Sequence, residues 1–291
     1  MLEQQNRKLC IFSLISAIVV VLCTCIGVVM NLTTLYDENF DHMGIRTFCM
    51  FTVNSNILVA MGMSLVIPYT IDGLQKRFYH IPKWLMIFLL AGTVAVTLTF
   101  LVSLFILSPV KGFRLIFTGS RFYLHALGPI TAIVAFSFFI SDHTLSWKDS
   151  NYALIPVFLY ACVYYVLVVV IGEERGGWND FYGFATRIPV WIPMVLILPL
   201  TFGIATLLRL QHNWMFRHLR EVSVPDEYSE EYLRDTVKWL AEKNALSDQP
   251  GTDLVIPRGL IRYLMDTTEG DMSFREVCIL YLDTYLEHNK I

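Results

Sequence analysis

Six long apolar runs, separated by short polar connections, dominate the first 210 residues of the chain. Each run has about 20 residues or more, the length that an α-helix needs to cross the hydrocarbon core of a bilayer. The pattern therefore predicts six transmembrane helices. They are expected near Leu9–Met30, Phe48–Thr70, Trp84–Val110, Phe122–Ser141, Tyr152–Ile171 and Pro189–Leu208.

Composition supports a membrane protein. Hydrophobic residues make up 55% of the 291 residues, only 16% are charged, and the mean hydropathy is +0.53. Soluble domains usually have about a quarter of their residues charged, so this chain has too little polar surface for a water-soluble globule of its size. The first apolar run is too long for a signal peptide and lacks an A-x-A cleavage pattern, so we expect it to be retained as a span.

The character of the chain changes after Leu210. Residues 213–291 have a net charge of −6, whereas residues 1–212 have a net charge of +3. Three amphipathic helices are expected in this tail, and Ser273 with Glu276 has the spacing of a capping box. We therefore expect an all-α protein, with a six-span transmembrane domain over 1–212 and a small acidic helical cytoplasmic domain over 213–291.

Charge also bears on orientation and partners. Nine Lys and Arg residues flank the spans on the side of the N-terminus and six flank them on the other side, a bias that favours both termini in the cytoplasm. The acidic tail argues against nucleic acid as a partner and leaves a protein partner of residues 213–291 open. The cysteines have no metal-binding spacing, and we find no nucleotide-binding or HExxH motif, so no metal site or cofactor is predicted.

Polar residues gather in one place inside the second apolar run, in the segment "FTVNSN" from Phe51 to Asn56. In a helix, Thr52, Ser55 and Asn56 share a face. The simplest interpretation is that these side chains hydrogen-bond to neighbouring helices, which contributes about 0.6–2 kcal/mol for each bond.

A catalytic interpretation starts from His125, which is the one histidine placed inside an expected span. Thr52 and His125 both lie three or four residues after their spans begin, and these two spans run in the same direction. A hydroxyl and an imidazole at equal depth have the groups needed for nucleophilic acyl transfer. Asn56 and Ser55 are then candidates to stabilise an oxyanion or bind substrate, and Arg121 is a candidate to hold a lipid carboxylate or phosphate.

A third residue that orients the imidazole is not evident. No Asp or Glu lies inside an expected span. Asp41 and Asp180 are expected on the same side of the membrane as Thr52 and His125, so they are the acidic residues to consider for this role.

At these residues the chain resembles the androgen-induced/ADTRP-like membrane hydrolases, together with bacterial membrane proteins of the Pr6Pr type. The matching stretches are "GIRTFCMFTVNSNILVA" (Gly44–Ala60), "LHALGPITAIVAF" (Leu124–Phe136), "NYALIPVFLYACVYY" and "WNDFYGF". The resemblance covers about residues 5–210. It implies an intramembrane threonine hydrolase that cleaves fatty-acyl esters, with Thr52 as nucleophile and His125 as base. It also implies a multi-pass protein of a bacterial plasma membrane, with the bilayer and a lipid-like substrate as partners.

Two other functions remain open. One is a non-enzymatic membrane protein that binds lipid or a partner, in which the polar residues of the second span join helices. A transporter is the weaker alternative, because the expected spans lack acidic residues and show no repeated pair of broken helices.

Overall fold

The structure is a computed structural model that describes residues 2–33, 44–76, 81–140, 144–183 and 191–223. Within these ranges it contains helices and no strands, and six helical stretches are long and apolar enough to cross a membrane. The predicted all-α, six-span architecture is confirmed, whereas the helices expected beyond residue 223 lie outside the described residues. The six stretches are Arg7–Thr33, Phe51–Leu74, Lys83–Lys111, Phe122–Phe139, Trp147–Ile171 and Val195–Phe216.

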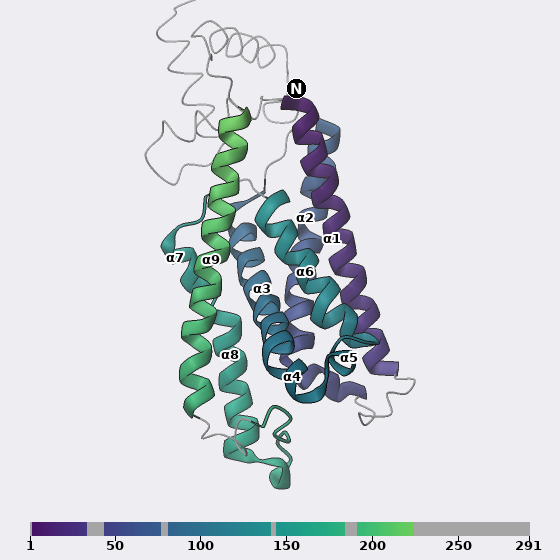
Figure 1. The fold of residues 1–291 in the computed structure, drawn as a ribbon, viewed down its shortest axis with the longest axis vertical. Coiled ribbons are helices and arrows are strands. Elements are labelled where there is room, and N and C mark those ends of the chain that lie inside the picture. Colours follow the sequence, from purple (N-terminus) through teal and green to yellow (C-terminus); the bar gives the residue numbers. More distant parts are fainter. Residues whose placement is uncertain (1, 34–43, 77–80, 141–143, 184–190, 224–291) are drawn as a thin grey trace, which may run out of the picture.

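Successive spans run in opposite directions, so the start of α1 and the end of α9 lie at the same end of the bundle (Figure 1). The second and fourth spans both begin at the opposite end, beside α4 and α5. The elements in chain order are α1 (Leu2–Thr33), η1 (Gly44–Cys49), α2 (Phe51–Lys76), α3 (Lys83–Val102), η2 (Ser103–Leu107), α4 (Ser108–Lys111), α5 (Phe113–Ile116), η3 (Phe122–Leu127), α6 (Gly128–Val134), η4 (Ala135–Phe139), α7 (Trp147–Tyr152), α8 (Ile155–Tyr164), η5 (Tyr165–Ile171), η6 (Glu173–Arg175) and α9 (Trp191–Ser223).

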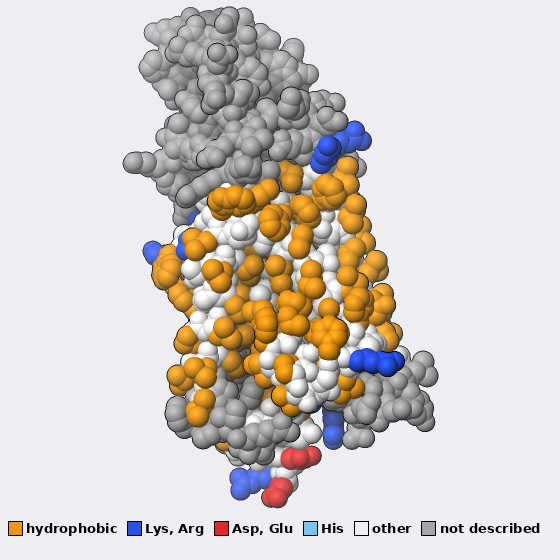
Figure 2. Space-filling model, viewed as in Figure 1, with side chains coloured by type: hydrophobic (Ala, Val, Ile, Leu, Met, Phe, Trp, Pro, Cys, Tyr) orange, Lys and Arg blue, Asp and Glu red, His pale blue; other side chains and the backbone are white. Residues whose placement is uncertain are grey.

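The surface of the bundle is that of a membrane protein. Hydrophobic side chains cover its middle, and the charged side chains in view lie towards its two ends (Figure 2). Large residues such as Phe105, Leu159 and Leu207 are more than half exposed, which water would penalise and lipid accommodates. The structure therefore agrees with a multi-pass membrane protein.

The third span is the centre of the bundle and is the most buried of the six. It packs against α2, α6 and α9. The contact with α2 is very close at Gly92, where an added Cβ would lie 2.9 Å from the Cα of Val59. Small residues at such positions let two helix backbones approach closely. Dispersion contacts then stabilise the pair, because the hydrophobic effect does not drive helices together within lipid.

Proline explains a local change of helical form in the fourth span. The turn Phe122–Leu127 is π-helical, and the Gly128 N–H bonds to the Tyr123 carbonyl five residues earlier. Pro129 follows directly; it has no N–H to donate to the carbonyl four residues before it, and its ring crowds that carbonyl. A π-turn relieves this conflict by widening the helix. His125 lies inside this widened turn.

The last span differs from the sequence-based expectation. We expected it to end near Leu208, before the charged Arg209, but α9 continues to Ser223 and its spanning stretch is Val195–Phe216. Arg209 is accommodated because its guanidinium lies 5.5 Å from the centre of the Trp147 ring, a cation–π contact. The boundary expected after residue 212 therefore falls inside a continuous helix.

Candidate functional site

Asn56 joins the second span to the fourth. Its side-chain Nδ2 donates to the Thr52 carbonyl at 2.7 Å, one turn earlier in α2, and to the Leu124 carbonyl of η3 at 2.9 Å. Since both neighbours are carbonyl oxygens, the amide must present its nitrogen to them. Both N–H groups of Asn56 therefore have carbonyl acceptors, one within α2 and one in the fourth span, which leaves neither for an oxyanion. The bond to Leu124 also places the first turn of α2 level with the first turns of the fourth span.

Ser55 joins the second span to the third. Its Oγ lies 3.0 Å from Thr99 Oγ1 of α3 and donates within α2 to the Thr52 carbonyl, also at 3.0 Å. Asn54, on another side of the helix, donates to the Phe48 carbonyl of η1 at 2.8 Å. These bonds give acceptors to donor groups that hydrocarbon cannot satisfy, while Asn56 Oδ1 is buried with no partner among the described residues. Three of the four polar residues in "FTVNSN" therefore have a structural role.

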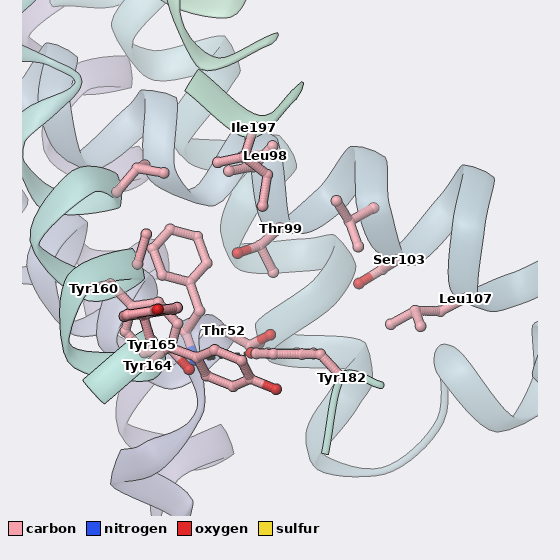
Figure 3. Close-up of a pocket in the computed structure, with 14 residues that line it drawn as sticks. Thr52, Leu98, Thr99, Ser103, Leu107, Tyr160, Tyr164, Tyr165, Tyr182 and Ile197 are labelled. Carbon is pink, nitrogen blue, oxygen red and sulfur yellow. Dashed lines mark hydrogen bonds between the residues drawn. The ribbon is translucent and has the colours of Figure 1, made fainter. Parts of the chain in front are cut away.

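Thr52, the expected nucleophile, has different surroundings. It lines a pocket between the second, third and fifth spans, at the end of the bundle away from the start of α1 (Figure 3). The space measures about 100 Å³ and is partly open to the outside. We call it the tyrosine pocket. Its lining residues are Phe51, Thr52, Leu98, Thr99, Val102, Ser103, Leu107, Val157, Tyr160, Ala161, Tyr164, Tyr165, Tyr182 and Ile197.

Three tyrosines build one end of this pocket. The Tyr182 hydroxyl accepts a hydrogen bond from the Phe51 N–H at 2.9 Å, and thereby caps the first turn of α2 from a loop more than 100 residues later. The Tyr160 hydroxyl donates to the Cys49 carbonyl at 2.7 Å, and the Tyr164 hydroxyl donates to Asp180 at 2.5 Å. The loop that follows the fifth span is thus tied to the start of the second.

Tyr182 is also the hydrogen-bonding neighbour of Thr52. Its hydroxyl contacts the Thr52 side chain as well as the Tyr160 hydroxyl, and burial raises the pKa of Tyr182 above the ordinary value for a phenol. A phenol with a raised pKa stays neutral, so it does not act as a base towards Thr52 at neutral pH. Tyr182 instead orients the hydroxyl beside it.

His125 is not among the residues that line the tyrosine pocket. Its Nδ1 lies 3.0 Å from the Ile116 carbonyl at the end of α5, and its ring meets the Phe117 ring edge-on. It is buried, and the backbone around it is level with the start of α2. The structure therefore places Thr52 and His125 at the same end of the bundle but in different surroundings, Thr52 in the pocket wall and His125 against α5.

The remaining candidates are placed as follows. Arg121 donates from Nη1 to the Leu115 carbonyl at 2.6 Å, and so fastens the turn between α5 and η3. Asp180 accepts from Tyr164, whereas Asp41 lies outside the described residues. No group of three or more His, Cys, Asp or Glu side chains within the described ranges could hold a metal ion.

Sequence reasoning missed two features of the interior. One is the tyrosine cluster, whose residues come from the stretches "FLYACVYY" and "FYGF"; repeated tyrosines at a span end were the available signal. The other is His212, which we assigned to a connection but which is fully buried in α9, with Nδ1 3.0 Å from the Phe136 carbonyl and its ring stacked on that of Phe136. His212 lies inside the bundle because α9 continues past Arg209. The charge of Arg209 concealed this continuation from sequence reasoning.

Comparison with known proteins identifies no relative. No family model, no curated protein and no solved structure matches the chain.

Proposed function

We propose that this multi-pass membrane protein binds a lipid-like molecule in the tyrosine pocket. One observation carries the proposal: a partly open cavity of about 100 Å³ lies among the spans, and its described lining has apolar walls and hydroxyl groups but no charged side chain. Sites that bind small molecules combine mostly apolar walls with a few polar groups that orient the ligand.

The polar residues around the pocket support binding over chemistry. Ser55 and Asn56 are occupied by bonds to the third and fourth spans, so their presence in an apolar run needs no reaction to explain it. Thr52 alone of this group faces the pocket. The polar segment then serves two purposes: it holds three spans together and presents one hydroxyl to a ligand.

Filling the pocket tests this function. Ala161 lines the pocket, whereas its neighbour Cys162 is exposed on the lipid side. The full chain is purified in mild detergent, and bound lipid is extracted and quantified by mass spectrometry. We expect Ala161→Phe to lose most of the lipid that wild type retains, and Cys162→Phe to retain it. Equal lipid retention by Ala161→Phe and wild type, with both folded, would contradict the proposal.

A second function, hydrolysis of a lipid ester, is favoured by the position of Thr52 in the same pocket wall. In this reaction the Thr52 oxygen attacks the ester carbonyl, the alcohol leaves with the proton taken from the hydroxyl, and a fatty-acyl ester of Thr52 forms. Water then cleaves that ester, releases the fatty acid and restores the hydroxyl. His125, outside the pocket lining, must come within one water molecule of Thr52 to serve as the base.

A fluorophosphonate probe distinguishes the two functions, because it marks an activated hydroxyl by forming a phosphonate ester with loss of fluoride. Hydrolysis predicts labelling of wild type, its loss in Thr52→Val, and its retention in Thr52→Ser. It also predicts slower labelling of His125→Gln. Binding without chemistry predicts no labelling of any of these proteins. Labelling that persists in Thr52→Val excludes Thr52 as the nucleophile.

A further inference from the structure

The described lining of the tyrosine pocket offers hydroxyl groups to an occupant and no charged side chain. Its lining contains hydroxyls from Thr52, Thr99, Ser103 and the tyrosines, while the remaining residues are aliphatic or phenylalanine. Among the described residues, the lining has no Lys, Arg, His, Asp or Glu. An occupant must therefore place any polar group it has against hydroxyls alone.

Most of these hydroxyls already have a protein acceptor. The Thr99 hydroxyl has two acceptors within reach, Ser55 Oγ at 3.0 Å and the Ala95 carbonyl at 3.2 Å. Tyr160 donates to Cys49, and Tyr164 donates to Asp180. Ser103 lies one turn after Thr99 on the same face of the third span. Its main-chain groups keep helical hydrogen bonds, whereas its side-chain hydroxyl has no hydrogen-bond partner among the described residues. Its hydroxyl projects into the space that Thr52 and Thr99 also border (Figure 3).

A charged head group is poorly matched to such a site. Moving a carboxylate or an ammonium out of water costs several kcal/mol unless a counter-charge or several strong hydrogen bonds compensate. The carboxylate of Asp180 accepts a hydrogen bond from Tyr164, which lines the pocket, and it adds repulsion for an anion. A neutral hydroxyl or ester carbonyl needs only one or two hydrogen bonds, which Ser103 and Thr52 provide.

We propose that the occupant is a neutral single-chain lipid with a hydroxyl or ester group, such as a monoacylglycerol or a long-chain alcohol, bound through Ser103 and Thr52. This inference rests on the proposed lipid-binding function and adds the chemical class of the ligand. The aliphatic wall formed by Val102, Leu107 and Val157 takes the hydrocarbon chain. Free fatty acids and cationic amphiphiles of the same chain length bind more weakly.

The test compares matched ligands on the full chain in phosphatidylcholine nanodiscs. The ligands are 1-palmitoylglycerol, hexadecanol, palmitate and hexadecyltrimethylammonium, all with sixteen-carbon chains, each competing with a fluorescent acyl probe at pH 8. We expect the two neutral ligands to displace the probe at concentrations at least tenfold lower than the two charged ones. Palmitate as effective as 1-palmitoylglycerol would overturn the neutral class and leave lipid binding itself intact. If none of the four ligands displaces the probe or binds to the protein, the proposed lipid-binding function would itself be contradicted.

Variants locate the head group. Ser103→Ala should weaken displacement by 1-palmitoylglycerol about five- to tenfold, and Thr52→Val should do the same, with the melting temperature measured in parallel to verify folding. Ser64→Ala is the matched control, because Ser64 is exposed in α2, outside the pocket, and donates to the Ala60 carbonyl of its own helix. Unchanged affinity of folded Ser103→Ala for the neutral ligands would overturn the assignment of their polar group to Ser103.

Discussion

The side-chain amide of Asn56 donates a 2.9 Å hydrogen bond to the main-chain carbonyl of Leu124, and this bond joins the second span to the fourth. Leu124 also packs against α1, because an added Cβ at Gly27 would meet its side chain. Three spans thus meet around one amide.

Asn56→Leu should therefore destabilise the protein, because two carbonyls that now accept from Nδ2 lose their shared donor. Intramembrane hydrogen bonds contribute about 0.6–2 kcal/mol each, so we expect a clear fall in melting temperature. Asn54→Leu is the control: Asn54 donates to Phe48 at the exposed end of the helix and should cost less. An equal fall in both variants, measured by thermal unfolding in detergent, would show that the bridge to Leu124 adds nothing.

Gly92→Ala should separate α2 from α3. The added methyl would lie 2.9 Å from the Val59 Cα, and backbone cannot move aside as a side chain can. Overpacking of this kind costs about 1–3 kcal/mol. Gly203→Ala in α9 has open space around its Cβ, so it should leave the melting temperature unchanged or slightly raised. A Gly92→Ala protein as stable as Gly203→Ala would be inconsistent with the close contact.

Tyr182→Phe should weaken the first turn of α2, because the Phe51 N–H loses its acceptor. Loss of such a cap costs about 1 kcal/mol. Tyr152→Phe, at an exposed position, is the control and should have no effect.

Alkaline pH should reveal the contribution of Tyr182 to the stability of the protein. Burial raises the pKa of Tyr182 above the ordinary value of about 10, so the folded protein favours the neutral phenol. The resulting stabilisation is complete below pH ~10 and is lost as the pH rises towards the pKa of the folded state. The melting temperature of wild type should therefore fall more steeply between pH 9 and 11 (about the phenol range) than that of Tyr182→Phe. Parallel curves for the two proteins would exclude this contribution.

Asn213→Ala should release α9 from the start of the fifth span. The Asn213 side chain accepts from the Leu145 N–H at 2.8 Å and donates to the Leu145 carbonyl at 2.8 Å, as a strand neighbour would. Loss of both bonds should cost about 1–3 kcal/mol. Asn151→Ala, on the exposed face of α7, serves as the control. Asn213→Asp keeps the acceptor but loses the donor, and its melting temperature should lie between those of wild type and Asn213→Ala.

The six spans were predictable because a bilayer requires long apolar helices, and length with composition is enough to find them. The end of the sixth span was not, because Arg209 is charged in the sequence while its contact with Trp147 depends on how distant segments pack. The helix-joining role of Ser55 and Asn56 was the simplest expectation from their polarity, and the structure supplies the partners Thr99 and Leu124.

The neighbours of Thr52 could not be predicted from the sequence, because the rotation of each helix about its axis was not known. Equal depth in two parallel spans was the available argument for His125, but depth says nothing about rotation around the helix axis. The hydroxyl that meets Thr52 belongs to Tyr182, from a loop that no helical periodicity describes. Side-chain direction in a bundle is set by packing, and packing here includes a π-turn that rotates the residues around His125.

The cap that Tyr182 places on α2 has a consequence for biosynthesis. A ribosome delivers the chain from the N-terminus, so the second span enters the bilayer long before residue 182 has been synthesised. Until then the Phe51 N–H lacks its acceptor, and the walls supplied by the fifth and sixth spans are missing. The tyrosine pocket is therefore a late product of membrane insertion, completed only when the last third of the described chain has emerged and folded back on the first.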